Sequence, residues 1–307
     1  MTQRLLIDTD PGVDDALAIL MAYRHSRIEA LSITAGNVGL AHTVANALKL
    51  TELVGADTPV YPGCPVPLVL PAEDAAHVHG MDGFGDAGIA PAHRAAADEH
   101  AALALVRLAR AHPGELTLVA LGPLTNLALA LRLDPDLPSR IARLVVMGGA
   151  VTGRGNTSVS AEFNIGFDPE AAHVVFSSWP MFELVDWEAT VRHALDFDQA
   201  ERWFASGDKR ATFYGAISKK TRAFNKERER PGLIAADALA MAVVLDPGIV
   251  VRAEERHVSV ELNGALTRGA TIVDWDRRGG KAPNARIVLD VDHARFAAMI
   301  AQALGAA

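Results

Sequence analysis

The feature that most constrains the fold is an alternation of short β-rich runs with longer helical patterns along the first two-thirds of the chain. Predicted strands cover residues 5–8, 28–34, 116–120, 144–147 and 181–185, and predicted helices cover 14–23, 41–53, 99–111, 124–132 and 169–176. Repeated βα units of this kind build a mainly parallel sheet flanked by helices. The alternation therefore predicts an α/β fold with a doubly wound, Rossmann-like core.

The last third of the chain follows a different pattern. Helices are predicted at 199–205, 211–229 and 237–244, followed by short strands near 258–262, 271–273 and 286–289. No Ser/Pro/Gly-rich linker, internal repeat or low-complexity tract separates this part from the core. We therefore expect one domain over residues 1–307, with a C-terminal helical and β embellishment.

Charge and hydropathy exclude several classes of function. The chain has 29 Lys and Arg against 37 Asp and Glu, a formal net charge of −8, which disfavours binding to nucleic acid or to an anionic membrane surface. The longest apolar runs fall well short of the ~20 residues of a membrane helix, and residues 5–7 are too short for a signal peptide. The single cysteine, Cys64, fits a reducing compartment. We expect a soluble, cytoplasmic protein that binds a small molecule.

Four aspartates gather directly after the first predicted strand, at Asp8, Asp10, Asp14 and Asp15. Aspartates in a first helical turn accept hydrogen bonds from free backbone N–H groups, so capping is one interpretation. One or two carboxylates satisfy that need, whereas four so close together repel one another unless a cation neutralises them. A hard cation held by oxygen ligands is the interpretation that we favour. In open parallel sheets, ligands bind where such strands end.

The segment Asp8–Ala16, read as DTDPGVDDA, resembles the signature of the inosine-uridine-preferring nucleoside hydrolases. Further segments resemble that family in the same order, at 35–38, 79–85, 121–126, 147–149, 155–156, 161–165 and 168–172. The resemblance implies a nucleoside-hydrolase-like fold and calcium-dependent hydrolysis of the N-glycosidic bond of ribonucleosides to ribose and free base. It also implies a role in nucleoside salvage and assembly into a homodimer or homotetramer.

Carried over residue by residue, the resemblance implies two groups of site residues. The calcium ligands would be Asp10, Asp15, Asp237 and the backbone carbonyl of Leu121, with Asp10 also taking a proton from the metal-bound water. The ribose hydroxyls would be held by Asp14, Asn37, Asn156, Glu162 and Asn164. Clustered carboxylates suit this chemistry, because cleavage of a ribosyl C–N bond passes through an oxocarbenium-like state. From the residues alone, a polar loop followed by helix caps is the preferred interpretation of the last three.

The sequence offers fewer candidates for contact with the nucleobase than for contact with the metal or the ribose. His79, Tyr214 and Arg222 are candidates to contact the leaving base, with Asn225 beside them; His79 could also be a solvated loop histidine. The segment Lys209–Arg230 carries eight basic and two acidic residues, and its simplest interpretation is a solvated helix face.

The chain departs from the family pattern at Ala236, where well-studied members carry a histidine that assists the departing base. An alternative function is therefore a binding protein for nucleosides or sugars that has lost catalysis. A third class, the aspartate-nucleophile phosphatases, fits less well because Pro11 and Gly12 follow the second aspartate.

Overall fold

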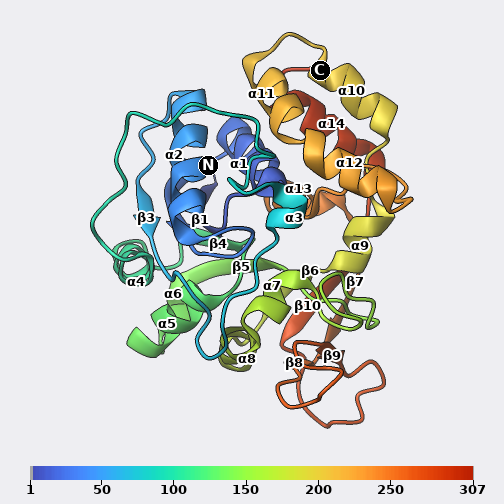
Figure 1. The fold of residues 1–307 in the computed structure, drawn as a ribbon. Coiled ribbons are helices and arrows are strands. Elements are labelled where there is room, and N and C mark those ends of the chain that lie inside the picture. The colour runs from blue at the N-terminus through green and yellow to red at the C-terminus, as the bar shows by residue number, and fades with distance from the viewer. Residues whose placement is uncertain (1–2, 307) are drawn as a thin grey trace.

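An eight-stranded sheet forms the centre of the computed structural model, which describes residues 3–306 (Figure 1). Across the sheet the strands are β3 (Val60–Pro62), β2 (Arg27–Ile33), β1 (Arg4–Thr9), β4 (Leu116–Ala120), β5 (Ile141–Met147), β6 (Phe182–Val185), β10 (Ala285–Val291) and β7 (Val250–Arg256). The strand pairs are parallel except for β10 and β7, which pair antiparallel. The predicted mainly parallel α/β sheet is confirmed.

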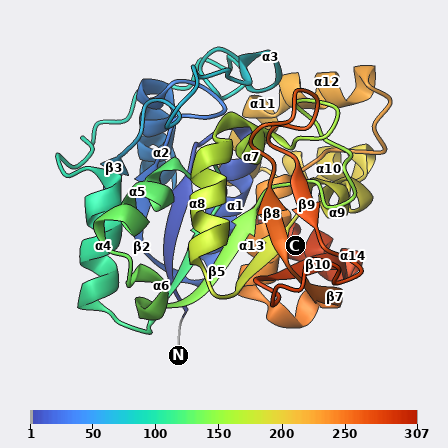
Figure 2. The same cartoon turned by 90° about the horizontal axis from the view of Figure 1, so that it is seen from below.

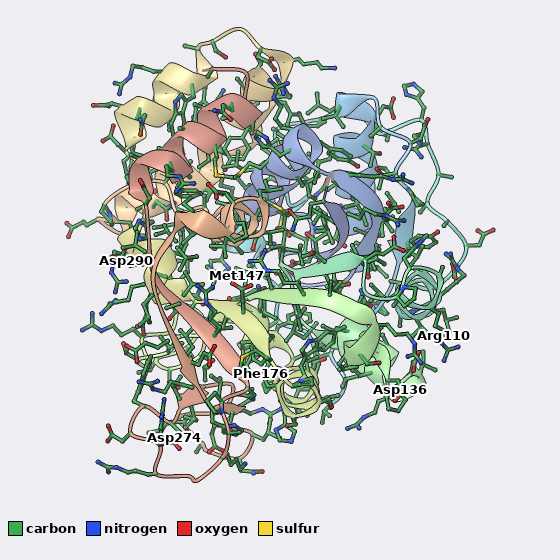
Figure 3. The ribbon with its side chains drawn as sticks, turned by 180° about the vertical axis from the view of Figure 1, so that it is seen from behind. Arg110, Asp136, Met147, Phe176, Asp274 and Asp290 are labelled. Atoms are coloured by element: carbon green, nitrogen blue, oxygen red, sulfur yellow. The ribbon has the colours of Figure 1, made fainter. Side chains whose placement is uncertain are left out.

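Helices cover both faces of the sheet. One face packs against α1 (Val13–His25), α2 (Leu40–Val54), α11 (Lys209–Ile217), α13 (Ala236–Leu245) and α14 (His293–Ala303), and the other against α4 (Ala101–Ala111), α5 (Thr125–Leu133) and α8 (Pro169–Ser178). Met147 and Phe176 lie in the interior, whereas Arg110 and Asp136 are exposed at the periphery (Figure 3). Strands buried on both faces explain why β1, β4 and β5 are nearly continuous apolar runs.

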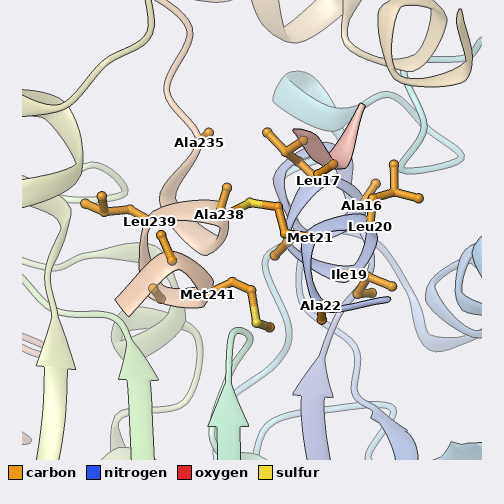
Figure 4. Packing of buried hydrophobic residues seen from close by; sticks show 14 of the residues in the cluster. Ala16, Leu17, Ile19, Leu20, Met21, Ala22, Ala235, Ala238, Leu239 and Met241 are labelled. Carbon is orange, nitrogen blue, oxygen red and sulfur yellow. The ribbon is translucent and has the colours of Figure 1, made fainter. Parts of the chain in front are cut away.

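Helix α13 is apolar around its whole circumference, and it packs deep against α1. Ala238 and Met241 of α13 face Met21 of α1, and the small alanine side chains let the two helices approach closely (Figure 4). At the other end of α13, the guanidinium of Arg143 donates to the carbonyls of Val243 and Val244 at 3.0 and 3.1 Å. These contacts fix α13 at its carboxyl end and direct its amino end towards the loop after β1.

The remaining helices are short or peripheral. They are α3 (Ala76–His79), α6 (Leu137–Arg140), α7 (Phe163–Phe167), α9 (Trp187–Arg192), α10 (Phe197–Phe204), α12 (Lys219–Glu227) and the single 3₁₀ turn η1 (Pro247–Ile249). Strands β8 (Val258–Val260) and β9 (Thr271–Val273) form a separate antiparallel pair. No helix between residues 3 and 306 is both long enough and apolar enough to cross a bilayer.

Several elements differ from the sequence-based expectations. The C-terminal strand β10 is part of the main sheet, because it pairs with β6 and carries β7 on its outer edge. Strands β3 and β7 were not predicted, since β3 is very short and β7 is an exposed edge strand with a mixed polar sequence. The expected helix at 211–229 is two helices, which meet at Ser218. The Ser218 hydroxyl donates to the carbonyl of Tyr214 at 2.6 Å, a bond that competes with regular helix continuation.

Candidate active site

A cavity of about 330 Å³ opens at the carboxyl ends of the central strands. Helices α3, α7 and α12 gather around this end of the molecule, far from the start of β1 (Figure 2). The strands deliver residues to it directly, because Leu121 follows β4 and Asn37 lies in the loop after β2. The cavity therefore occupies the place in the sheet where an α/β fold binds its ligands.

Three carboxylates from distant parts of the chain converge at one end of the cavity. Asp14 and Asp15 lie in the first turn of α1, and Asp237 lies in the first turn of α13. One oxygen from each of them lies within 4.8 Å of the others. The packing of α1 on α13 thus brings together the acidic residues that are more than two hundred positions apart in the sequence.

Asp10 lies beside this group and is 1% exposed. Its Oδ2 accepts a hydrogen bond of 2.6 Å from the backbone N–H of Asn37. Its Oδ1 is buried and has no hydrogen-bond partner within residues 3–306. A buried carboxylate oxygen without a donor is unfavourable, so a ligand such as a cation would stabilise this atom.

Two glycines make room for Asp10. A Cβ atom at Gly36 would collide with Oδ2 of Asp10, and one at Gly122 would collide with Oδ1. Backbone therefore approaches both oxygens of this carboxylate at positions where a side chain has no space.

The hydrogen bonds of Asp15 hold its carboxylate in place. It accepts from the hydroxyl of Thr9, from the backbone N–H of Gly12 at 3.0 Å and from Nδ2 of Asn37 at 3.0 Å. Asn37 thus donates to both Asp10 and Asp15 and links the loop after β2 to the loop after β1.

The acidic residues have raised pKa values. Burial raises the pKa of Asp10 and of Asp237 well above the usual range, and the neighbouring aspartates add to the shift. Burial also raises the pKa of Asp14 to about 6 and that of Glu162 to about 7. These directions mean that the cluster holds more negative charge than its own protein surroundings neutralise.

The donor set at this end of the cavity fits a hard divalent cation. It consists of carboxylate oxygens, one of which is the buried, unpartnered Oδ1 of Asp10, together with the carbonyl of Leu121. Nδ2 of Asn164 donates to that carbonyl at 2.6 Å. The acidic cluster is therefore a candidate metal centre.

The residues expected to hold ribose all line the cavity: Asp14, Asn37, Asn156, Glu162 and Asn164. Glu162 is also the N-cap of α7. Its carboxylate accepts from the backbone N–H groups of Gly149 at 2.8 Å, Asn164 at 2.9 Å and Ile165 at 3.2 Å. The capping interpretation and the site interpretation therefore both describe Glu162.

The three candidates for contact with the base are placed differently. His79 lines the cavity, and its Nδ1 accepts from the backbone N–H of Val13 at 3.1 Å, so the ring proton lies on Nε2. Burial lowers the pKa of His79 to about 4, which keeps the ring neutral. Tyr214 and Arg222 are not among the described residues that line the cavity. Arg222 is engaged elsewhere, 4.8 Å from the ring of Phe204 and 3.3 Å from a carboxylate oxygen of Glu201.

Sequence reasoning missed most of the residues at the other end of the cavity. The rest of the cavity wall, which we call the aromatic end, includes Val78, Trp187, Phe224, Arg228, Arg230 and Ile234, with Asn225 beside them. The guanidinium of Arg230 lies 5.0 Å from the ring of Trp187 and 5.6 Å from that of Phe224. These residues belong to no motif. The one usable signal was the helical spacing of Thr221, Phe224, Asn225 and Arg228, which places them on one face of α12.

A model of the inosine-uridine preferring nucleoside hydrolase family matches residues 5–298, which is nearly the whole chain. The chain belongs to this family. Its members are hydrolases of N-glycosyl bonds, so this nucleoside hydrolase is an enzyme of that class.

Known relatives resemble this nucleoside hydrolase along their full lengths. The inosine-uridine preferring nucleoside hydrolase of Leishmania major is 36% identical, over 99% of this chain and 98% of its own. The pyrimidine-specific ribonucleoside hydrolase RihB of Escherichia coli is 33% identical, over 94% and 93% of the two chains. A solved inosine-guanosine nucleoside hydrolase superposes with a TM-score of 0.93 at 34% identity, covering 99% of each chain.

At Ala236, where the family resemblance leads one to expect a histidine, this nucleoside hydrolase has a small apolar side chain in the cavity wall. The residue is 4% exposed, lies at the first position of α13 and lines the cavity next to Asp237. A methyl group can neither donate nor accept a proton, so Ala236 cannot assist a leaving base.

Proposed function

We propose that this chain hydrolyses the N-glycosidic bond of ribonucleosides, giving ribose and a free base, and that it depends on a calcium ion. The observation that carries the proposal is the convergence of Asp14, Asp15 and Asp237, with Asp10 beside them, at one end of a cavity whose other end is aromatic. A nucleoside has the matching division into a polar sugar and a flat base.

The proposed ligands of the ion are Asp10, Asp15, Asp237 and the carbonyl of Leu121. An all-oxygen set with several carboxylates suits calcium, which binds six to eight oxygens in flexible geometry. The ion would orient a water molecule and the ribose hydroxyls and increase the acidity of that water. Support comes from the like-charged carboxylates and from the unpartnered Oδ1 of Asp10.

Asp10 is the proposed general base. Its carboxylate lies beside Asp15 and Asp237, where it would accept a proton from the attacking water. The oxygen of water forms a bond to C1′ while the bond from C1′ to the base nitrogen breaks, and the bonding pair leaves with the base. Direct attack of this kind inverts the configuration at C1′.

The ribose and the base would bind to separate parts of the wall. Asn37, Asn164 and Glu162, together with Asp14 and Asn156, would hold the hydroxyl groups, since each hydroxyl both donates and accepts. The base would lie against Phe224 and Trp187, with the Nε2–H of His79 available as a donor. The complete acidic end favours hydrolysis over the binding-only alternative.

Other expectations stay predictions. They are a single domain over residues 1–307, a homodimer or homotetramer, a cytoplasmic location and a role in nucleoside salvage. Contacts of Tyr214 or Arg222 with the base are predictions as well.

The function can be tested with a panel of ribonucleosides and a reducing-sugar readout. The panel would include inosine, guanosine and uridine, because relatives are named for inosine, uridine, guanosine or pyrimidine substrates. We expect ribose release that stops after exhaustive chelation and returns with calcium. Binding of ribonucleosides without any release of ribose would overturn the proposal in favour of a binding protein.

A further inference from the structure

Two arginines line the aromatic end of the cavity, beside Trp187 and Phe224. They are Arg228, at the carboxyl end of α12, and Arg230, just beyond it. We propose that Arg230, assisted by Arg228, stabilises the negative charge that develops on the departing base. This inference rests on the proposed function and names the groups that replace the absent histidine at Ala236.

Arg230 is held in a defined position. Its guanidinium donates to Oδ1 of Asn225 at 3.0 Å, and its backbone N–H donates to the carbonyl of the same residue at 3.0 Å. The intervening Glu229 adopts a left-handed conformation with φ of 52°, which turns the chain back over the end of α12. The rings of Trp187 and Phe224 lie on its flanks. A charge fixed in this way loses little entropy when it meets a ligand.

The charge of Arg230 is not neutralised by the protein. Arg230 is half-buried, yet within residues 3–306 no carboxylate lies within ion-pair distance of Arg228 or Arg230. The nearest charge that acts on Arg230 is Arg228, which repels it. Two neighbouring guanidinium groups without an acidic partner repel each other, and a negative ligand group would relieve that repulsion.

The distribution of charge along the cavity matches the charge separation of the reaction. As the C1′–N bond breaks, the ribose becomes positive and the base takes the bonding electron pair and becomes negative. Carboxylates surround one end of the cavity and arginines lie at the other. Interactions that strengthen as charge develops lower the barrier more than they improve substrate binding. The base anion then takes a proton from water, and the proton held by Asp10 returns to solvent.

Arg230 suits this role better than the other polar groups near the base. The Nδ1 of His79 already accepts from Val13, so its neutral ring can only donate a hydrogen bond from Nε2. Arg222 is paired with Glu201, and its guanidinium also donates to the carbonyl of Gly215 at 3.1 Å. Arg230 has no such acidic partner.

The test compares substrates whose leaving groups differ in how strongly their negative charge must be stabilised by the enzyme. One set is a series of ribonucleosides whose bases differ in the acidity of the departing nitrogen. The other substrate is 4-nitrophenyl ribofuranoside, whose leaving group is a stable anion on its own. A protein group that stabilises negative charge on the leaving group should therefore increase the cleavage rate of the nucleosides strongly and that of the nitrophenyl substrate only a little.

The variants separate charge from structure. Arg230→Gln removes the charge, Arg230→Lys keeps it, and Arg202→Gln is the matched control, because Arg202 is exposed on α10 and does not line the cavity. We expect Arg230→Gln to lower kcat on nucleosides about 100-fold, more steeply for the less acidic bases, and to change kcat on the nitrophenyl substrate by less than about threefold. Arg230→Lys should retain an intermediate rate, and Arg202→Gln should match the unmodified protein.

Thermal unfolding would check that each variant folds. If Arg230→Gln does not fold, Arg228→Gln makes the same comparison at an exposed position, with an expected loss of about tenfold on nucleosides alone. Equal losses on both kinds of substrate, or no loss on either, would overturn the inference. An unmodified protein that cleaves neither substrate would instead overturn the proposed function.

Discussion

The two ends of the cavity are built in different ways. At the acidic end, Asp10, Asn37 and Leu121 come from loops that directly follow central strands, and backbone hydrogen bonds and neighbouring glycines fix them. At the aromatic end, Phe224 comes from one face of α12, and Arg230 lies in the turn after it. The acidic end is thus set by the central strands and by the first turns of α1 and α13, whereas the aromatic end depends on a peripheral helix and its turn.

This difference in construction suggests that the two ends have different tasks. Groups attached to the sheet have little freedom to move, which suits the chemistry at C1′, where small displacements reduce the rate strongly. Groups on α12 and α9 can change without disturbing the sheet, which suits recognition of the base. Relatives with the same fold carry names that differ in the base, among them inosine-uridine, pyrimidine-specific and inosine-guanosine enzymes.

The largest effect is expected from Asp10→Asn. Loss of the general base should lower kcat by at least about 1,000-fold, while the folded structure persists, because the substitution removes a buried charge without changing shape. Steady-state kinetics and thermal unfolding of the variant would measure both. Asp198→Asn, at an exposed position on α10, is the matched control. A variant with unchanged kcat would break the assignment of chemistry to the acidic end.

Glu162→Gln should have the next largest effect. Gln keeps one acceptor oxygen but turns an NH₂ group towards backbone N–H donors at the start of α7. We expect kcat/KM to fall about 10- to 100-fold, the size expected when hydrogen bonds to a charged group are lost. The control is Glu73→Gln, in an exposed loop. If kcat/KM stayed within twofold of the unmodified protein, Glu162 would be a helix cap and no part of the ribose site.

Removal of divalent ions should make stability depend on pH. The pKa values of Asp14 and Glu162 are raised to about 6 and about 7, so the folded chain binds protons more tightly than the unfolded chain. That stabilisation is complete below about pH 4 and is lost as pH rises through about 6 to 7. In chelator, the unfolding temperature should therefore fall by roughly 5 °C between pH 5 and pH 7.5.

Calcium should restore the unfolding temperature at pH 7.5 and have much less effect at pH 5, where more of the carboxylates are protonated. Asp237→Asn should weaken the response to calcium, because it removes one proposed ligand. A response of equal size at both pH values would contradict a carboxylate metal site.

The smallest effect among these variants is expected from replacing Phe224. Phe224→Ala removes a ring on which the base would stack, so KM should rise about tenfold while kcat changes less. Phe224→Tyr keeps the ring and should keep KM. Kinetics on inosine and uridine would measure both variants, and a loss confined to kcat would contradict the role of Phe224 in binding the base.

The sequence was sufficient for the fold and for most of the acidic end. Buried parallel strands leave a strong apolar pattern in the sequence. Asp10, Asp14 and Asp15 lie within six consecutive positions of the chain. Asp237 is different, because only its resemblance to a family position pointed to it, and only the packing of α13 on α1 brings it close. Edge strand β7 was missed because one exposed edge needs no regular apolar pattern.

The aromatic end could not be predicted for a physical reason. Trp187, Phe224 and Arg230 meet through the packing of α9 against the turn after α12, and their local sequences do not record that contact. The break at Ser218 turns α12 relative to α11, so a single helix over 211–229 gives the wrong register for its faces. The sequence analysis named Arg222 as a candidate to contact the base, yet Arg230 lines the cavity and Arg222 does not.

The glycines beside Asp10 limit how this enzyme can diversify. Because a Cβ atom at Gly36 or Gly122 would collide with a carboxylate oxygen of Asp10, any larger residue at either position would displace this proposed general base. New substrate preferences must therefore arise on the opposite wall, where exchange of a ring or a guanidinium leaves the reactive oxygen untouched. Directed evolution of this scaffold should accept many substitutions along α12 and almost none at those two glycines.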